Sequence, residues 1–323
     1  MELVLSSPDL RGIIPAIVTP MNEKYEVEED DLRSYARWIA RFEIGGLAVN
    51  VDTGEGPHLS DEERKRIISI VSSVIGNRVP IVAGVPPAST RDAGKSASDA
   101  RESGANALLV FPHPFFYGQP LSADLPYNYH RAIAMASRLP IVLFQLQPAL
   151  GGYELTEETL LRLIEIPEVV AIKEALFDAF KYYNTLRILR RAPRKITMLT
   201  GNDNFICESL ILGAEGALIG FGTLATDQQV EMHKLVKKKR FTEAMEIWEN
   251  IRPLEEVIFG PPVRDYRART KVALYLQGVI ENVHVRPPLS PVSESEMQKV
   301  REALVKAGVP VVRRVEVGKR PSR

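Results

Sequence analysis

The sequence has almost no cysteine and no long apolar run. Cys207 is the single cysteine among 323 residues, so no disulfide can form within one chain, and a reducing compartment is favoured. No uninterrupted apolar stretch approaches the roughly 18 residues of a membrane span. The first residues lack the basic segment and the apolar core of a signal peptide. We therefore expect a cytoplasmic protein that has no membrane contact.

An excess of charge of either sign is also missing. Lysine plus arginine and aspartate plus glutamate number 41 each, which leaves no electrostatic argument for a nucleic-acid partner. The only basic cluster is the tail over 313–323, where we expect a solvated terminus. The five histidines are scattered and none stands at zinc-ligand spacing, so no metal site is predicted. No nucleotide-binding motif is present.

What the sequence does contain is a regular alternation of short apolar runs with segments of helical pattern, from near the N-terminus to about residue 225. The runs that predict strands are eight in number: 13–18, 46–51, 80–85, 107–111, 141–144, 169–173, 196–200 and 217–221. The helices expected between them are 29–43, 62–75, 89–103, 126–138, 156–166, 178–191 and 203–213.

This alternation predicts an α/β protein with a closed (β/α)8 barrel, the TIM barrel. The alternative is an open, doubly wound sheet, which usually has fewer strands and often a glycine-rich first turn. The first turn here, Thr19-Pro20-Met21-Asn22, contains no glycine, which favours the barrel.

Beyond residue 225 the pattern is helical only. Helices are expected at 226–238, 241–255, 264–281 and 293–307. The first of these would complete the barrel. The sequence therefore predicts a barrel over 11–240, a C-terminal helical extension over 241–310 and a basic, flexible tail over 311–323.

The most informative residue is Lys173, which follows the apolar run Val169-Val170-Ala171-Ile172. Such a run is typical of a fully buried parallel strand, and we expect Lys173 at its last position, at the mouth of the barrel. Desolvation disfavours the ammonium form, so a lysine there can become a nucleophile near neutral pH and form a Schiff base with a carbonyl substrate. The alternative is that Lys173 merely ends a strand at the surface.

Functional residues of a TIM barrel lie where its strands end. The segments at the other strand ends are Thr19-Pro20, Asp52-Thr53-Gly54-Glu55, Phe111-Pro112-His113-Pro114-Phe115-Phe116-Tyr117, Phe144-Gln145-Leu146-Gln147, Gly201-Asn202-Asp203-Asn204 and Gly220-Phe221-Gly222.

Over about residues 11–300 the chain resembles the dihydrodipicolinate synthase / N-acetylneuraminate lyase family. The motifs that carry the resemblance occur in that family's order and approximate spacing: Gly12-x-x-x-Ala16-x-x-Thr19-Pro20, Asp52-Thr53-Gly54-Glu55, Val170-Ala171-Ile172-Lys173-Glu174-Ala175, Gly201-Asn202-Asp203 and Gly213-Ala214-Glu215-Gly216. The resemblance implies a TIM barrel, a class I, aldolase-type lyase and a homo-oligomer, either a dimer or a tetramer built from dimers.

The resemblance also implies roles for individual residues. Lys173 matches the lysine that attacks the keto carbon of pyruvate or another 2-oxo acid. The protonated imine then serves as the electron sink for carbon–carbon bond making or breaking, or for dehydration, so no cofactor is required. The turn Asp52-Thr53-Gly54 matches the one whose backbone N–H groups and hydroxyls bind the substrate's carboxylate. Phe144 and Leu218 match positions beside that site.

The sequence departs from the family's pattern at three places. Phe144 replaces a tyrosine that relays protons, a kind of help often worth about 10²–10⁴ in rate. An ionised Asp52 would repel a substrate carboxylate unless it points away, is protonated or is itself the base. The segment 145–151 lacks the arginine with which dihydrodipicolinate synthases hold their second substrate. Asp52, His113, Tyr117 and Gln147 are candidates to replace the lost relay, and none stands out.

These departures argue against the lysine-biosynthetic reaction and favour an aldolase or dehydratase that acts on a sugar-acid-like or aromatic 2-oxo acid. Three alternatives stay open. The chain could be a catalytically silent paralogue that binds a small ligand, a reading that Phe144 supports and Lys173 opposes. It could be a true 4-hydroxy-tetrahydrodipicolinate synthase. A phosphate-binding barrel enzyme is suggested only by Gly220-Phe221-Gly222 before a helix N-terminus.

Overall fold

Eight parallel strands and a ring of helices make up the computed structural model, which describes residues 8–117 and 121–313. From residue 314 onward, the predicted basic tail lies outside the described residues. The strands are β1 (Gly12–Pro15), β2 (Leu47–Val49), β3 (Ile81–Val85), β4 (Ala107–Val110), β5 (Ile141–Leu146), β6 (Val169–Ala175), β7 (Thr197–Thr200) and β8 (Gly216–Ile219).

The strands follow one another around a single sheet in the order β1-β8-β7-β6-β5-β4-β3-β2. A parallel bridge between Ala16 and Ala48, just beyond β1 and within β2, closes the sheet on itself. The N–H of Ile17 donates to the carbonyl of Ala48 at 3.0 Å across the same seam. The predicted TIM barrel is confirmed.

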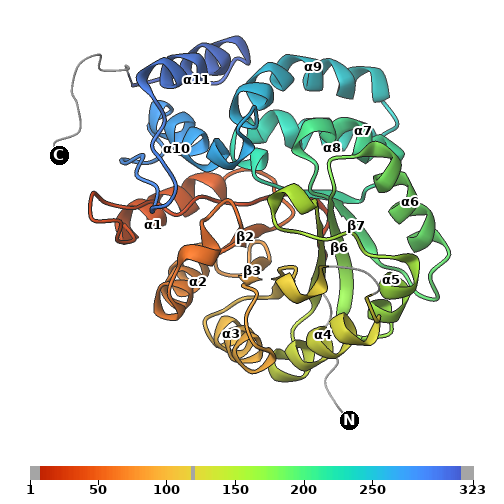
Figure 1. Ribbon diagram of the computed structural model, residues 1–323. Coiled ribbons are helices and arrows are strands. Elements are labelled where there is room, and N and C mark those ends of the chain that lie inside the picture. Colours follow the sequence, from red (N-terminus) through yellow and green to blue (C-terminus); the bar gives the residue numbers. More distant parts are fainter. Residues whose placement is uncertain (1–7, 118–120, 314–323) are drawn as a thin grey trace.

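Helices surround the barrel (Figure 1). The ring consists of α1 (Glu29–Ile39), α2 (Asp61–Ile75), α3 (Thr90–Glu102), α4 (Asp124–Ser137), α5 (Glu157–Ile164), α6 (Ala179–Arg190), α7 (Ile206–Leu212) and α8 (Thr226–Lys237). The chain continues into α9 (Phe241–Ile258), α10 (Tyr266–Leu276) and α11 (Glu294–Lys306), which gather on one side of the barrel. Single 3-10 turns are η1 (Gly56–His58), η2 (Pro114–Phe116), η3 (Pro148–Leu150), η4 (Asp203–Phe205), η5 (Phe221–Thr223) and η6 (Val263–Asp265).

Alternation along each strand divides the apolar residues into two cores. One side of a strand faces the barrel interior and the other faces the helices. In β6, Ala171 and Ala175 belong to the interior cluster, whereas Ile172 belongs to the larger cluster between strands and helices. Lys173 stands between the two alanines, so its side chain points into the barrel.

The strands β5 and β6 run further than the apolar pattern predicts. Lys173, expected at the last position of its strand, lies within β6, because the pairing with β5 continues through Glu174 and Ala175. Glu174 is fully buried in the sheet. Its carboxylate accepts hydrogen bonds from the side chain of Asn202 at 2.6 Å and from the N–H of Leu176 at 3.2 Å. These bonds offset the cost of burying a charged residue, which is why a glutamate does not end the strand.

The C-terminal extension is tied to the loop after β2 by two buried contacts of Glu55. The ammonium of Lys271, in α10, donates to Oε1 of Glu55 at 2.5 Å, and both side chains are fully buried. The N–H of Arg286, in the segment after α10, donates to the other carboxylate oxygen at 2.8 Å. This loop also carries Asp52 and Thr53, so the extension fixes the residues at one side of the barrel mouth.

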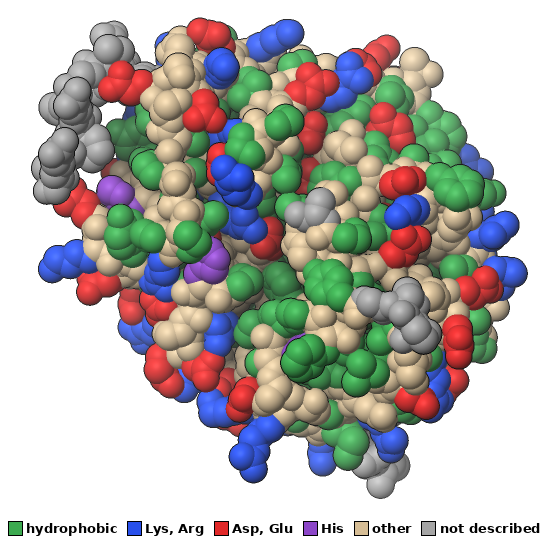
Figure 2. Space-filling view, viewed as in Figure 1, with side chains coloured by type: hydrophobic (Ala, Val, Ile, Leu, Met, Phe, Trp, Pro, Cys, Tyr) green, Lys and Arg blue, Asp and Glu red, His purple; other side chains and the backbone are tan. Residues whose placement is uncertain are grey.

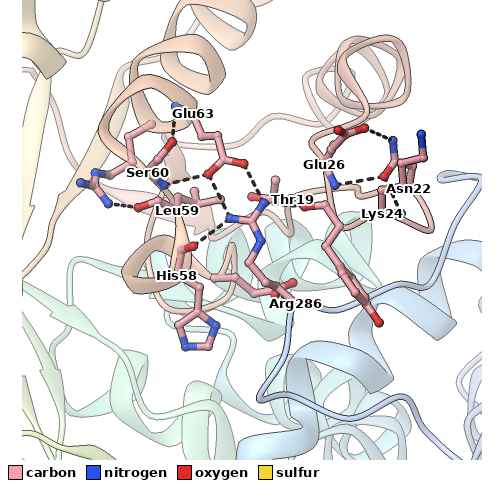
Figure 3. A network of polar contacts seen from close by, with 12 residues as sticks. Thr19, Asn22, Lys24, Glu26, His58, Leu59, Ser60, Glu63 and Arg286 are labelled. Carbon is pink, nitrogen blue, oxygen red and sulfur yellow. Dashed lines mark hydrogen bonds and ion pairs between the residues drawn. The ribbon is translucent and has the colours of Figure 1, made fainter.

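Arg286 holds the same loop through its guanidinium (Figure 3). The guanidinium donates to the carbonyl of His58 at 2.8 Å and to both carboxylate oxygens of Glu63 at 2.9 and 2.6 Å. Glu63 also completes a capping box with Ser60 at the start of α2. A bidentate arginine of this kind fixes both the distance and the orientation of the two segments.

Acidic and basic side chains are interspersed on the surface. On the face shown in Figure 2, acidic and basic side chains alternate around the edge, while hydrophobic side chains gather nearer the middle. No helix among the described residues is long and apolar enough to cross a membrane.

Candidate active site

The amine of Lys173 lies at the inner wall of the barrel mouth. The side chain is only 7% exposed, and its flanking inward residues, Ala171 and Ala175, are small. Gly201, at the end of β7, leaves the remaining space, because a Cβ at this position would lie 2.6 Å from Cε of Lys173 and 2.8 Å from Cβ of Ala175. The glycine after β7 therefore makes room for the lysine of β6.

Phe144 is the lateral neighbour of Lys173 in the barrel, because the two residues are paired across β5 and β6. The Nζ atom of Lys173 lies 4.5 Å from the centroid of the Phe144 ring. Phe111 packs edge-on against the same ring, with centroids 5.4 Å apart and planes at 82°. The family's tyrosine position thus presents an aromatic face, without a hydroxyl, to the amine.

A cavity of about 30 Å³ opens beside these two residues. One water molecule requires roughly 10–15 Å³. The cavity therefore has room for water, and a larger molecule can enter only if the lining side chains move apart. The lining residues come from the loops at the carboxyl ends of the strands and from the C-terminal extension: Asp52, Thr53, Phe144, Leu146, Leu150, Lys173, Ala175, Phe177, Gly201, Asp203, Gly220, Phe259, Val263 and Tyr266.

Asp52 is paired with a cation. Its carboxylate forms an ion pair with Arg267, and Nε of Arg267 donates to the backbone carbonyl of Asp52 at 2.9 Å. The hydroxyl of Tyr266 donates to the second carboxylate oxygen at 2.8 Å. Burial alone would raise the pKa of Asp52, but the charge and hydrogen bonds of Arg267, together with the Tyr266 hydroxyl, lower it below its ordinary value. Asp52 is therefore ionised, and Arg267 neutralises its charge.

The other residues predicted to bind the substrate lie at different depths. Thr53 is buried and lines the cavity. Gly54 and Leu218 are not among the described lining residues. The carbonyl of Gly54 accepts a hydrogen bond from the Thr19 hydroxyl at 2.7 Å, and Leu218 is fully buried in the barrel interior opposite Ile14. Their roles beside a substrate stay predictions.

Asp203 is a second carboxyl at the cavity, located at the start of η4 after β7. It is buried, and its Oδ1 accepts the N–H of Phe221 at 2.8 Å. Burial raises the pKa of Asp203 to about 7, although the Phe221 N–H and Lys173 oppose the rise. The same N–H belongs to Gly220-Phe221-Gly222, so an aspartate already occupies a donor that the phosphate-binding alternative would need.

Burial lowers the pKa of Lys173, and the negative charges of Asp203 and Asp52 partly oppose this. Glu255 of α9 adds a further carboxyl beside Asp203; its pKa is raised to about 8, mainly by burial and then by the charge of Asp203. The arrangement therefore places an amine with increased nucleophilic character beside a carboxyl that titrates near neutrality. Such a pair is suited to carbonyl and proton-transfer chemistry.

The end of β6 is fixed by Asn202. Its side-chain nitrogen donates to the backbone carbonyl of Glu174 at 3.0 Å, and its side-chain oxygen accepts the N–H of Phe177 at 2.6 Å. Together with the bond to the Glu174 carboxylate, these contacts hold the strand that carries Lys173 against β7. Contacts of this kind keep the strand that carries a side chain in one geometry.

Sequence reasoning missed Tyr266 and Arg267. Both lie in α10 and contact Asp52 from 214 and 215 positions away, and no local motif marks them. The three remaining candidates for the lost relay, His113, Tyr117 and Gln147, are not among the described residues that line the cavity. The ring of His113 instead accepts the N–H of Phe115 at 3.1 Å within its own turn.

The replacement of Asp203 by asparagine tests the electrostatic environment of Lys173. Because the charge of Asp203 raises the pKa of Lys173, its removal should lower that pKa further. Attack on a ketone requires the neutral amine, so the rising limb of the rate of adduct formation should move to lower pH in Asp203→Asn. The check is the pH profile of pyruvate trapping by borohydride. An unchanged profile would show that Asp203 does not act on the amine.

Comparisons with known proteins support a single family. The profile of the "Dihydrodipicolinate synthetase family" matches residues 9–307. A protein of Methanothrix thermoacetophila named "4-hydroxy-tetrahydrodipicolinate synthase" is 31% identical over 92% of this chain and 96% of its own length. A protein of Gluconacetobacter diazotrophicus with the same name is 28% identical over 93% of this chain and 97% of its own length.

Solved structures give the same result. A dihydrodipicolinate synthase from Acinetobacter baumannii, crystallised in complex with pyruvate, superposes with a TM-score of 0.82 at 29% identity, over 93% of this chain and 100% of that one. A monomeric dihydrodipicolinate synthase variant superposes with a TM-score of 0.85 at 26% identity, over 94% of this chain and 99% of that one.

Proposed function

Because the chain belongs to the dihydrodipicolinate synthetase family, we propose that it is a lyase in which Lys173 forms a Schiff base with pyruvate or another 2-oxo acid. The observation that carries this proposal is the position of the Lys173 amine. It is buried, it lines the cavity at the barrel mouth, and burial lowers its pKa. A surface lysine that merely ends a strand would have none of these properties.

The proposed chemistry begins when the neutral amine attacks the keto carbon and water leaves. The protonated imine that results is an electron sink, and it stabilises negative charge that develops on the neighbouring carbon. The proposed binding site for the substrate's carboxylate is the Thr53 hydroxyl, which lines the cavity, together with the turn that carries it. Arg267 supports this role, because it neutralises Asp52 and thereby removes the repulsion expected from the sequence.

An aldolase or dehydratase fits the site better than the synthase named in the relatives. No arginine occurs in the segment 145–151, so the carboxylate of the synthases' second substrate would lack its usual cation there. Instead, Leu146 and Leu150 line the cavity together with Phe144 and Phe177. This apolar wall favours a bulkier, less charged 2-oxo acid. The alternatives are a true 4-hydroxy-tetrahydrodipicolinate synthase and a catalytically silent paralogue.

The first test is trapping of the imine. The protein is incubated with pyruvate and with a panel of sugar-acid and aromatic 2-oxo acids, reduced with borohydride, digested and analysed by mass spectrometry. We expect a reduced adduct on the peptide that contains Lys173. Lys271 is an internal control, because it too is buried but its ammonium is held by Glu55, and it should stay unmodified. If none of these acids is trapped, the silent paralogue is the better interpretation.

We also propose, from the family resemblance, that the protein forms a homodimer or homotetramer. The side chains of Phe115 and Tyr117, at the barrel mouth, are 80% and 42% exposed, and aromatic side chains are enriched at subunit contacts. Light scattering coupled to size-exclusion chromatography measures the mass directly. A monomeric mass at micromolar concentration would contradict this proposal and leave the Schiff-base chemistry untouched.

A further inference from the structure

The proposed chemistry leaves one task without an evident residue. A proton must leave and return at the carbon next to the imine, and Phe144, which faces Nζ of Lys173 at 4.5 Å, has no hydroxyl with which to carry it. Unassisted, such a step loses about 10²–10⁴ in rate. This task exists only if the proposed function holds, and a residue at the cavity must then perform it.

Tyr266 brings a phenol to the cavity from outside the barrel. It is the only tyrosine among the described lining residues. Its hydroxyl donates to Oδ2 of Asp52 at 2.8 Å and lies 3.3 Å from Oγ1 of Thr53, the two residues of the predicted carboxylate-binding turn. The phenol oxygen therefore has a carboxylate that can take its proton and lone pairs that are free to accept another.

The ring of Tyr266 is held in place by contacts with Phe259, Arg267 and Gly220. It stacks on Phe259, with centroids 4.7 Å apart and planes at 18°, and the Arg267 guanidinium lies 4.8 Å from its centroid. Gly220 admits the ring edge, because a Cβ there would lie 3.2 Å from Cε2 of Tyr266 and 3.0 Å from the Thr53 hydroxyl. A proton-transfer group needs such a fixed orientation.

We propose that Tyr266 is the catalytic residue that moves the proton between Asp52 and the carbon next to the Lys173 imine, in place of the hydroxyl missing at Phe144. In the forward step the C–H bond next to the protonated imine breaks, and its electron pair forms the carbon–carbon double bond of the enamine. The imine π pair returns to the nitrogen of Lys173. The proton passes to the phenol oxygen while the phenol's own proton passes to Oδ2 of Asp52.

Charge and atoms balance in this exchange. A cationic imine and an anionic carboxylate become a neutral enamine and a neutral carboxylic acid, and no further reactant is needed. Tyr266 is neutral before and after the step, which matters because burial raises its pKa well above the ordinary value. Arg267 keeps Asp52 ionised at rest, so the proton is held only briefly before it returns.

Asp203 is the competing candidate, since it lines the same cavity. Its Oδ1 is already engaged by the N–H of Phe221 at 2.8 Å. Asp203→Asn keeps the shape of the side chain and removes the carboxylate, so it is the matched comparison for Tyr266→Phe.

The experiment measures how fast the methyl protons of pyruvate exchange with solvent deuterium, followed by NMR, alongside borohydride trapping on Lys173. In Tyr266→Phe the adduct should still form, whereas exchange should fall by about 10²–10⁴. The double variant Phe144→Tyr/Tyr266→Phe restores a hydroxyl at position 144 in β5. Its exchange rate should be at least about tenfold higher than that of Tyr266→Phe. Tyr153→Phe removes a buried hydroxyl that is not among the described lining of the cavity, and it should retain exchange within about threefold of the wild type. Asp203→Asn should lose less exchange than Tyr266→Phe does.

The outcomes separate this inference from the proposed function. Exchange in Tyr266→Phe within about threefold of the wild type, with the adduct intact, overturns the role of Tyr266 and leaves the Schiff base standing. A loss that Phe144→Tyr does not restore points to a structural role and also overturns it. A larger loss in Asp203→Asn assigns the step to Asp203. If the wild type forms no adduct with pyruvate, the proposed function and this inference fail together for that substrate.

Discussion

Lys173→Met is expected to abolish borohydride trapping and to reduce turnover by at least about 10³-fold, since removal of a covalent nucleophile costs some enzymes about 10⁶-fold. The physical reason is that the nucleophile is the amine itself, and no second described lysine lines the cavity. The chain should remain folded. Lys173 is buried without an ion-pair partner within 4 Å among the described residues, so no ion pair offsets the desolvation of its amine, and the amine contributes little to stability.

A second expectation for the Lys173→Met variant concerns its stability relative to the wild type. Methionine is unbranched like lysine, is one atom shorter because it lacks the amine, and should keep the packing of the chain against Gly201 without a charge. The free energy of unfolding, measured with urea, should therefore be equal to or higher than that of the wild type, as is common where a residue is strained for function. Lys173→Arg is the control that keeps a cation but cannot form an imine. Marked destabilisation of Lys173→Met would mean that the amine is structural.

Glu55→Gln should destabilise the protein by about 3–5 kcal/mol, the cost of breaking a buried ion pair by removing one partner. Glu55 and Lys271 are both fully buried, and the substitution leaves the ammonium of Lys271 in the interior without an anion. The loop after β2 should loosen together with α10, so binding of a 2-oxo acid should weaken as well. Unfolding in urea measures the free energy of unfolding. The extent of imine trapping shows whether the loosened loop still binds the 2-oxo acid.

Three further variants identify the cause. Lys271→Met alone should be similarly destabilising. The double variant Glu55→Gln/Lys271→Met should lose less stability than the two single variants added together, because it leaves no buried charge unpaired. Glu62→Gln is the matched surface control: Glu62 pairs with Lys65, and their side chains are 82% and 34% exposed. It should cost less than about 1 kcal/mol. A cost for Glu55→Gln no greater than that of Glu62→Gln would contradict the buried-pair argument.

Periodicity decided how much of the fold could be predicted. Eight apolar runs of strand length that alternate with helical segments favour a closed barrel over an open sheet, which usually has fewer strands, and the barrel was predictable for that reason. Strand ends were less predictable. Glu174 was expected beyond the strand because a charge rarely continues a buried run, and only its bonds to Asn202 and Leu176 show that β6 extends past Lys173.

The candidate site was predictable where one residue carries the information. Lys173 contrasts with the apolar run before it, and Phe144 stands out as a hydroxyl missing from a pattern. The neutralisation of Asp52 was not predictable, because the partners of a charge are set by distance in space and leave no trace in local spacing. Arg267 and Tyr266 reach Asp52 because α10 packs beside the barrel mouth.

The sequence by itself determined the alternation of strands and helices, and it placed a lysine at the mouth end of the sixth strand. That this lysine faces the barrel interior came from the structure, because both faces of its strand are apolar and the run does not distinguish them. Only the tertiary structure decided the electrostatics around that lysine. Burial, the ion pair of Asp52 with Arg267 and the phenol of Tyr266 arise from contacts between segments more than two hundred residues apart, and a local pattern cannot encode such a contact.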